Sequence, residues 1–152
     1  MKKNIQSLIL RLITLLAKLF LICFIFLITA SIIAVSVNYF SPDFNRGFLA
    51  GKEELFEGFF PFGLYAHVIT APFLIVLTSI LIFFRLEYRF PAMHRALGKT
   101  VVITGFLLFI PSSFILSVFA LGGTLGIFLF STLSMLSFIS LFLAYVSIRK
   151  KD

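Results

Sequence analysis

Four long apolar stretches alternate with short polar segments along this chain. The stretches cover residues 19–40, 62–84, 100–121 and 127–148. Each holds roughly 22 residues, which as an α-helix would extend about 33 Å and cross the hydrocarbon core of a bilayer. Unbroken apolar runs of this length are typical of transmembrane helices. The pattern therefore predicts an all-α polytopic membrane protein, a four-transmembrane-helix bundle in a single integral membrane domain over residues 1–152.

The first eighteen residues carry apolar side chains at helical spacing beside scattered cations. Leucine and isoleucine recur every three or four positions, and the cations are Lys2, Lys3, Arg11 and Lys18. This periodicity predicts an N-terminal amphipathic interfacial helix that lies on the membrane surface and leads into the first span. A cleaved signal peptide is the alternative, but the long basic start and the long apolar run fit a retained span better.

The longest connection covers residues 41–61. A Ser-Pro-Asp sequence at its start should end the first helix. Acids alternate with apolar residues over residues 52–60, which predicts short amphipathic turns with one face toward lipid. The lipid-facing side chains should be Leu55, Phe56, Phe59 and Phe60. We interpret the segment as an interfacial cap over the bundle, and the alternative is a lid over the mouth of a cavity.

Two prolines lie inside predicted spans. Pro72 and Pro111 lack a backbone N–H, so each should leave a helix carbonyl without its donor and kink the helix. Ser112 and Ser113 follow the second proline and could satisfy backbone groups freed there. The fourth predicted span carries small residues along one face, which favours close packing against a neighbouring helix. These residues are Ser131, Ser134, Ser137, Ser140, Ala144 and Ser147.

Charge orients this arrangement. The chain is 61% hydrophobic and 12% charged, and its net charge is +7. Because the cations lie at the ends of apolar stretches, we expect no nucleic-acid binding. They gather in the N-terminal segment, in the hairpin over residues 85–99 and at the C-terminus. By the positive-inside rule, both termini and the hairpin should face the cytoplasm, with the hairpin cations against anionic lipid head groups.

Few residues could carry chemistry. The interiors of the spans contain no Asp, Glu, Lys or Arg, and the single cysteine allows no internal disulfide. We expect no catalytic residue and no metal site, and the candidate functional residues are His67, His94, Arg95 and Lys99. On a structural interpretation, His67 bonds a backbone carbonyl, a serine or Tyr65, while His94 meets water or lipid phosphate. Arg95 and Lys99 would share a helix face at the depth of the phosphates.

Haem b is the cofactor that two histidines suggest. From His67 to the end of its span at Phe84 is about 26 Å of helix. Two imidazoles on one iron must approach within about 4 Å of each other, since metal–nitrogen bonds are about 2 Å long. One chain therefore cannot supply both His67 and His94, and haem would need a ligand from another copy, another subunit or solution.

The residues around the two histidines resemble those of a known family. Ala66-His67-Val68 stands early in one span, and Pro91-Ala-Met-His-Arg-Ala-Leu-Gly-Lys99 opens the next. This combination is similar to bacterial predicted membrane proteins of unknown function, in which a Pro-x-x-His-Arg-x-Leu-Gly-Arg/Lys motif opens a transmembrane helix. Members of that family continue into a His-Arg-x-Trp-Met segment that is missing here, so a site that needs that later histidine is either absent or supplied by a partner. The matching positions within residues 64–152 are His67, His94, Arg95, Leu97, Gly98 and Lys99.

These patterns predict a protein of the bacterial inner (plasma) membrane with N- and C-termini in the cytoplasm. The leading hypothesis is a non-enzymatic membrane subunit or accessory protein, with a second copy or another membrane subunit as its partner. One alternative is a haem- or quinone-linked electron-transfer component that uses His67 or His94. The other is a small-solute transporter, which the lack of charge inside the spans disfavours.

Overall fold

The computed structural model of the chain describes residues 2–149. Within these residues the chain is helical and contains no strand, and four helical units are long and apolar enough to cross a membrane. This confirms the predicted all-α, four-helix membrane architecture. The units are α1 (Lys2–Asn38), α2 (Phe59–Phe83), the joined run of α4 (Pro91–Thr104), η3 (Gly105–Phe109) and α5 (Ile110–Val118), and α6 (Gly123–Arg149).

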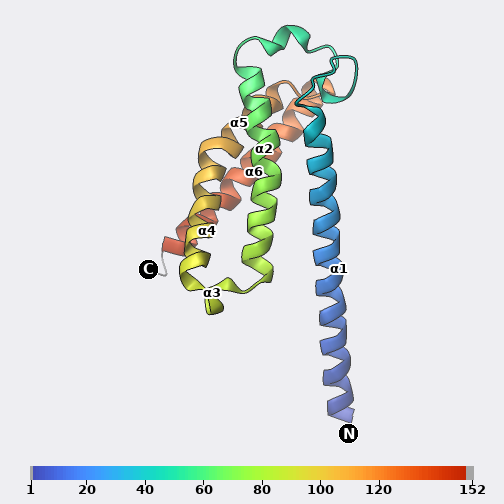
Figure 1. Cartoon of the computed structure of the whole chain (residues 1–152), viewed down its shortest axis with the longest axis vertical. Helices are drawn as coiled ribbons and strands as arrows, with labels where there is room; N and C mark the ends of the chain where they lie inside the picture. The colour runs from blue at the N-terminus through green and yellow to red at the C-terminus, as the bar shows by residue number, and fades with distance from the viewer. Residues whose placement is uncertain (1, 150–152) are drawn as a thin grey trace.

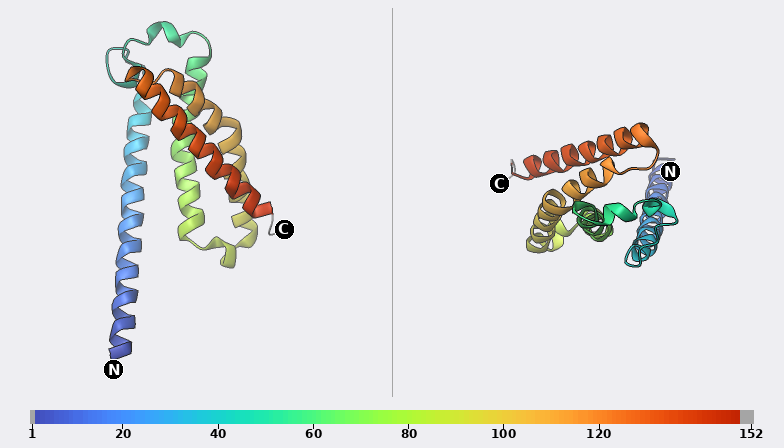
Figure 2. Two further views of the ribbon diagram at one scale, coloured as in Figure 1. Left: turned by 180° about the vertical axis from the view of Figure 1, so that it is seen from behind. Right: turned by 90° about the horizontal axis from the view of Figure 1, so that it is seen from above.

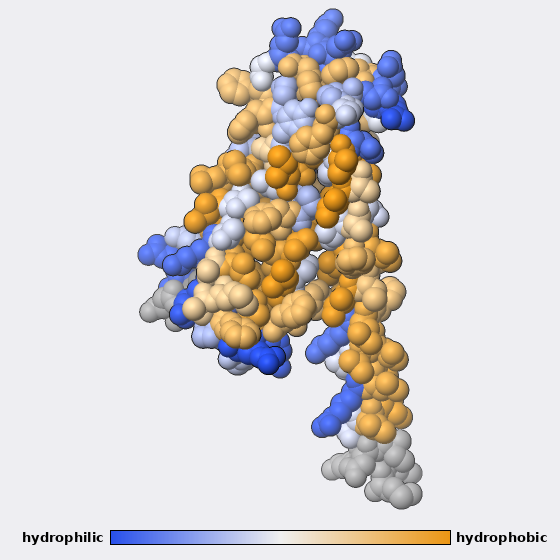
Figure 3. All heavy atoms as spheres, in the orientation of Figure 1, coloured by the Kyte–Doolittle hydropathy of each residue, from blue (hydrophilic) through white to orange (hydrophobic). Residues whose placement is uncertain are grey.

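The four units run alternately up and down (Figure 1). Two short 3-10 helices, η1 (Gly47–Leu49) and η2 (Glu53–Phe56), lie in the connection at one end, and the short helix α3 (Leu86–Arg89) lies at the other. The N-terminal end of α1, the basic hairpin at α3 and the C-terminal end of α6 all point toward the same end of the molecule (Figure 1). Hydrophilic side chains gather toward the two ends, with an apolar band between them (Figure 3).

The first helix is longer than the predicted span. α1 is one helix of 37 residues with no break near position 18, where a surface helix was expected to lead into the span. At 1.5 Å per residue it is about 55 Å long, and its N-terminal part extends well beyond the other helices (Figures 1 and 2). It packs against α2. The position of its first eighteen residues relative to a membrane surface stays a prediction.

The connection between α1 and α2 folds into an aromatic cap, which is the main buried cluster of the protein. Leu49, Phe60 and Leu64 are each no more than 2% exposed. Side chains from the loop after α1, from η1 and η2 and from the end of α5 pack around them, and these are Tyr39, Phe44, Phe48, Leu55, Phe56, Leu116 and Phe119.

The prediction that Leu55, Phe56, Phe59 and Phe60 all face lipid is wrong. Phe56 lies edge-on to Phe44 at 4.9 Å between ring centroids, and Phe60 lies 5.1 Å from Phe119 in the same way. Only Phe59 points outward, with 84% of its surface exposed. The reason is the turn at Gly58, where φ is +95°. Because α2 begins directly after it, Phe60 joins the inward face of that helix rather than an interfacial turn.

Small residues bring the bundle helices close together. A Cβ on Gly63 of α2 would lie 2.6 Å from Cγ2 of Ile115 on α5, and one on Gly105 would lie 2.5 Å from Cδ2 of Leu141 on α6. In α6, Ser134 is buried and Ser131 Oγ donates to Ser117 Oγ of α5 at 3.0 Å. Further along α6 the small residues that were expected to pack are exposed, because α6 crosses the bundle obliquely and leaves it (Figure 2). They are Ser140, Ala144 and Ser147.

Candidate functional site

A deep cleft runs between α1 and the bundle formed by α2, α5 and α6. Its volume is about 1130 Å³. It exists because α1 stands to one side of the other helices, as the view from above shows (Figure 2). Among the long helices of the described chain, α1 makes substantial contact with α2 alone. Most of the walls are aliphatic, and they include Ile25, Ile32, Leu64, Val68, Leu116 and Leu133.

The polar side chains of this cleft are mostly serines whose hydroxyl groups form hydrogen bonds within their own helices. Six of the seven lining serines donate the hydroxyl hydrogen to a carbonyl one turn earlier in their own helix, as serines in apolar helices commonly do, and Ser36 is the exception among the residues described. The six that do so are Ser31, Ser79, Ser113, Ser117, Ser134 and Ser137. A serine bonded in this way offers a ligand an acceptor oxygen but no free hydrogen.

His67 is the polar residue that distinguishes the cleft. It lies on the face of α2 that lines the cleft, is half-buried, and places Nδ1 3.1 Å from Ser113 Oγ of α5. Its ring stacks on Phe109, with 5.1 Å between ring centroids and 22° between the planes. A serine was one of three expected partners. Another, Tyr65, instead donates to the carbonyl of Tyr39 at 3.3 Å.

The opposing surface is built by an irregularity in the third span. Over η3 the helix widens into a π-helix, in which the Ile110 N–H donates to the Gly105 carbonyl. Pro111 follows directly and has no N–H to donate. Ser112 and Ser113 both donate to the Phe109 carbonyl, at 2.8 and 2.7 Å. The serines were expected to satisfy a group freed by the proline, but the carbonyl that loses its donor lies four residues before Pro111, at Leu107, and not at Phe109. Short π-helices are frequent at functional sites.

The π-helix and Phe109 were not foreseen from the sequence. The available signal was Gly105 placed six residues before Pro111, because glycine permits the close approach to Leu141 and proline ends the regular hydrogen-bond ladder. Neither residue alone distinguishes a π-helix from a simple kink. Whether α2 bends at Pro72, which lies inside that helix, stays a prediction.

The other candidate residues lie elsewhere. His94, Arg95 and Lys99 stand in the first turns of α4, at the hairpin end of the bundle (Figure 1). His67 lies toward the capped end of α2, so the structure does not bring the two histidines together. Arg95 and Lys99 are exposed, whereas His94 Nδ1 is buried and has no hydrogen-bond partner among residues 2–149. The expectation that this imidazole is simply solvated therefore fails for that nitrogen.

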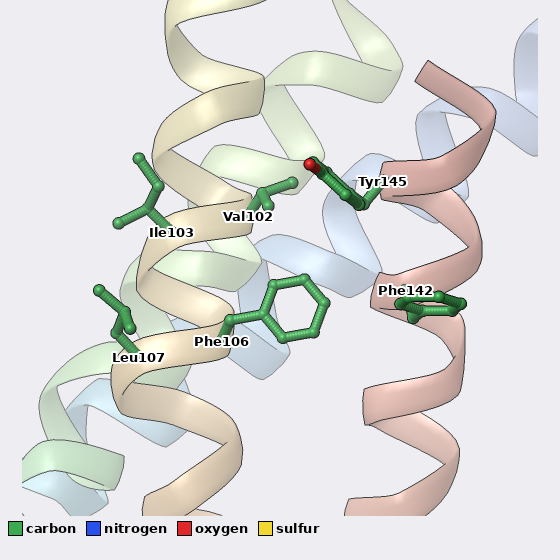
Figure 4. Close-up of a pocket in the computed structure, with 6 residues that line it drawn as sticks. All are labelled: Val102, Ile103, Phe106, Leu107, Phe142 and Tyr145. Atoms are coloured by element: carbon green, nitrogen blue, oxygen red, sulfur yellow. The ribbon is translucent and has the colours of Figure 1, made fainter. Parts of the chain in front are cut away.

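A second hollow is shallower and lacks this chemistry. It holds about 480 Å³ between α4, η3 and α6. Val102 and Phe106 face Phe142 and Tyr145 across it, while two further side chains turn to the outer side of the helix (Figure 4). All its lining residues are aliphatic or aromatic. It offers nothing to fix a polar head group, and the oblique course of α6 explains it.

Comparison with known proteins identifies the region that holds these features. Residues 64–152 match the model of a family described as "Predicted membrane protein (DUF2306)". The match contains His67, Phe109 and Ser113, together with His94 and the basic start of α4. It excludes α1 and the aromatic cap before Leu64. No curated protein and no solved structure matches the chain.

Proposed function

Since the chain belongs to this family of predicted membrane proteins, we propose that it is a non-enzymatic membrane subunit whose cleft holds a membrane-soluble small molecule. The observation that carries the proposal is the cleft of about 1130 Å³ beside His67. Ligand sites commonly occupy about 300–1000 Å³ and combine apolar walls with a few polar groups that fix orientation. This cleft is slightly larger than that range and combines apolar walls with a few polar groups.

We infer the orientation from charge. Arg85, Arg89, Arg95 and Lys99 lie at the same end of the molecule as the N-terminal part of α1, and the other end carries a mixed set of acids and cations. The positive-inside rule then supports a cytoplasmic hairpin and cytoplasmic termini in a bacterial inner membrane. Exposed Arg95 and Lys99 would meet anionic lipid head groups there.

The proposal is tested by filling the cleft. Ala71 lies one turn after His67 on the cleft-lining face of α2, so Ala71→Phe should occupy the space that a ligand would use. Ala144 is exposed on α6 and lies outside the cleft, so Ala144→Phe is the matched control. Native mass spectrometry of the protein purified in mild detergent should show one retained apolar molecule per chain in wild type and in the control, and at least a several-fold loss in Ala71→Phe.

Equal retention by the two variants, or no retained molecule in wild type, would contradict a ligand-binding cleft. Occupation of the cleft by a helix of a second copy would appear instead as a dimer that survives purification.

A second candidate is a haem- or quinone-linked electron-transfer component. One observation favours it, because His67 Nε2 has no hydrogen-bond partner among the described residues and the side chain lines the cleft. It could therefore ligate iron or bond a quinone oxygen. His94 lies at the opposite end, so a second axial ligand would come from outside the chain. The absorbance spectrum of the purified protein tests the haem form, since a haem band abolished by His67→Ala supports it and the lack of any haem band contradicts it.

A further inference from the structure

We propose that the cleft selects molecules whose head group donates a hydrogen bond, and that His67 Nε2 is the acceptor. The ligand class is a lipid-soluble hydroxyl compound, such as a long-chain alcohol or the reduced, hydroxyl-bearing form (quinol) of an isoprenoid quinone. This inference rests on the proposed function of the cleft and adds the polarity of the head group.

The hydroxyl group of Ser113 has a single hydrogen to donate. Its Oγ lies 2.7 Å from the Phe109 carbonyl oxygen, the usual length of an O–H···O bond. Ser112 donates to the same carbonyl at 2.8 Å, so both lone pairs of that oxygen hold hydroxyl hydrogens. With its hydrogen used in this way, Ser113 Oγ can only accept from His67 Nδ1. Their separation of 3.1 Å fits an N–H···O bond.

The second step is the charge of the imidazole. The apolar stretches of the three bundle spans contain no Asp, Glu, Lys or Arg, so an imidazolium at His67 would have no carboxylate to offset its burial. A neutral imidazole has one N–H. If Nδ1 carries it, Nε2 carries a lone pair. The ring is held in place by its stacking on Phe109.

The third step is the supply of donors. Nε2 has no hydrogen-bond partner among residues 2–149. Six of the seven serines that line the cleft have given their hydrogens to backbone carbonyls. The remaining hydroxyls of the lining, on Ser36, Thr78 and Tyr39, make no hydrogen bond to Nε2 within the described chain. A polar atom left without a partner in apolar surroundings is costly. A ligand hydroxyl would satisfy Nε2, whereas a carbonyl or ether oxygen would place two acceptors against each other.

The test compares two probes that differ in one hydrogen-bond donor. Farnesol and farnesyl methyl ether share a chain, and only farnesol has a hydroxyl hydrogen. We expect the full-length protein in nanodiscs to bind farnesol about tenfold more tightly, the effect of one hydrogen bond in apolar surroundings. His67→Phe retains a ring over Phe109 and removes Nε2. The affinity for farnesol should therefore fall to that for the ether, while the affinity for the ether stays unchanged.

Ser113→Ala separates the role of the proton from that of the ring. Without an acceptor for Nδ1–H, the imidazole can carry its hydrogen on either nitrogen, and the preference for farnesol should shrink. The ¹⁵N chemical shifts of His67, assigned by their loss in His67→Phe, should show a protonated Nδ1 in wild type and a mixture in Ser113→Ala.

The outcomes distinguish the two levels of the argument. Equal binding of both probes, tighter binding of the ether, or a wild-type His67 protonated on Nε2 would overturn the head-group rule and leave the ligand cleft in place. Binding of neither probe, together with no retained molecule in the native mass spectrum, would overturn the proposed function itself.

Discussion

Lys52 has only 7% of its surface exposed, which is rare for an ammonium group. Its Nζ donates to the Phe48 carbonyl at 2.6 Å and lies 3.5 Å from the centre of the Phe48 ring. Among residues 2–149, no carboxylate lies within ion-pair distance of this nitrogen. Burial therefore lowers the pKa of Lys52 from its ordinary value of 10.5. The lysine joins the aromatic cap through its stem and a single backbone oxygen.

This burial predicts a pH dependence of stability. Because the pKa of Lys52 is lower in the folded protein than in the unfolded chain, the unfolded chain binds more protons between the two values. The free energy of unfolding should therefore rise with pH through that window, up to about 10.5. As the pH is raised toward about 10.5, we expect the Tm of wild type in detergent to rise relative to the Tm of Lys52→Met, which has no titrating group at this position. Parallel curves for the two proteins would contradict the burial of a charged amine.

Sequence reasoning reached some of these residues and missed others. A serine was one of three partners foreseen for His67, because a polar ring inside a span must find a hydrogen bond. The burial of Lys52 and Phe60 was missed. Both depend on how the aromatic cap folds over the start of α2. The local sequence pattern of residues 52–60 is that of an exposed amphipathic turn, so it does not predict this contact.

At the scale of elements, glycines decide how closely the helices approach. Gly63 allows α2 to contact Ile115 of α5, and Gly105 allows η3 to contact Leu141 of α6. Gly98 of α4 has nothing within 4 Å of the position that a Cβ would take. Close approach through small residues is a main source of stability between helices in lipid.

These contacts predict opposite effects for one substitution at two sites. Gly63→Ala should destabilise the bundle by about 1–3 kcal/mol, because a new methyl group would overlap Ile115. Gly98→Ala should be neutral or stabilising by up to about 1 kcal/mol, since alanine favours helix and meets open space. Unfolding in mixed micelles by SDS measures both, and equal effects of the two changes would mean that α2 and α5 do not pack as described.

Element boundaries followed from the sequence less well than the elements themselves. The four apolar runs predicted four helices because their length alone requires it in lipid. The apolar run placed the third span from residue 100, whereas α4 starts at Pro91. The motif after Pro91 was itself expected to open this helix, since proline suits the first turn of a helix.

At the scale of the whole molecule, alternating helices put the basic hairpin and the charged start of α1 at one end and the aromatic cap at the other (Figure 1). The count of cations in the sequence predicted this pairing, since each pass through the membrane reverses the side. The cleft was not predictable in the same way. It depends on α1 standing apart from α5 and α6, which no local pattern specifies.

Reporter fusions test the orientation. A fusion after Leu55 should be active as an external reporter, and a fusion after Asp152 should report the cytoplasm, because the hairpin and terminal cations are retained inside. The fusion after Leu55 lies in the cap and the fusion after Asp152 leaves all four spans intact. A cytoplasmic signal at Leu55 would contradict the orientation and the alternation of the spans together.

α1 is longer than the hydrocarbon core of an ordinary bilayer is thick. Its 37 residues span about 55 Å against a hydrocarbon core of about 30 Å. Lys18 lies about 30 Å along the helix from Asn38, so with the cap at one interface its amine would snorkel at the other. The excess of about 25 Å carries leucines that are more than half exposed, such as Leu8 and Leu12. Tilting within the usual range of 0–40° recovers only part of it. We expect the remainder to bend along the lipid surface or to dock on another membrane protein, and in the second case this overhang is the contact surface.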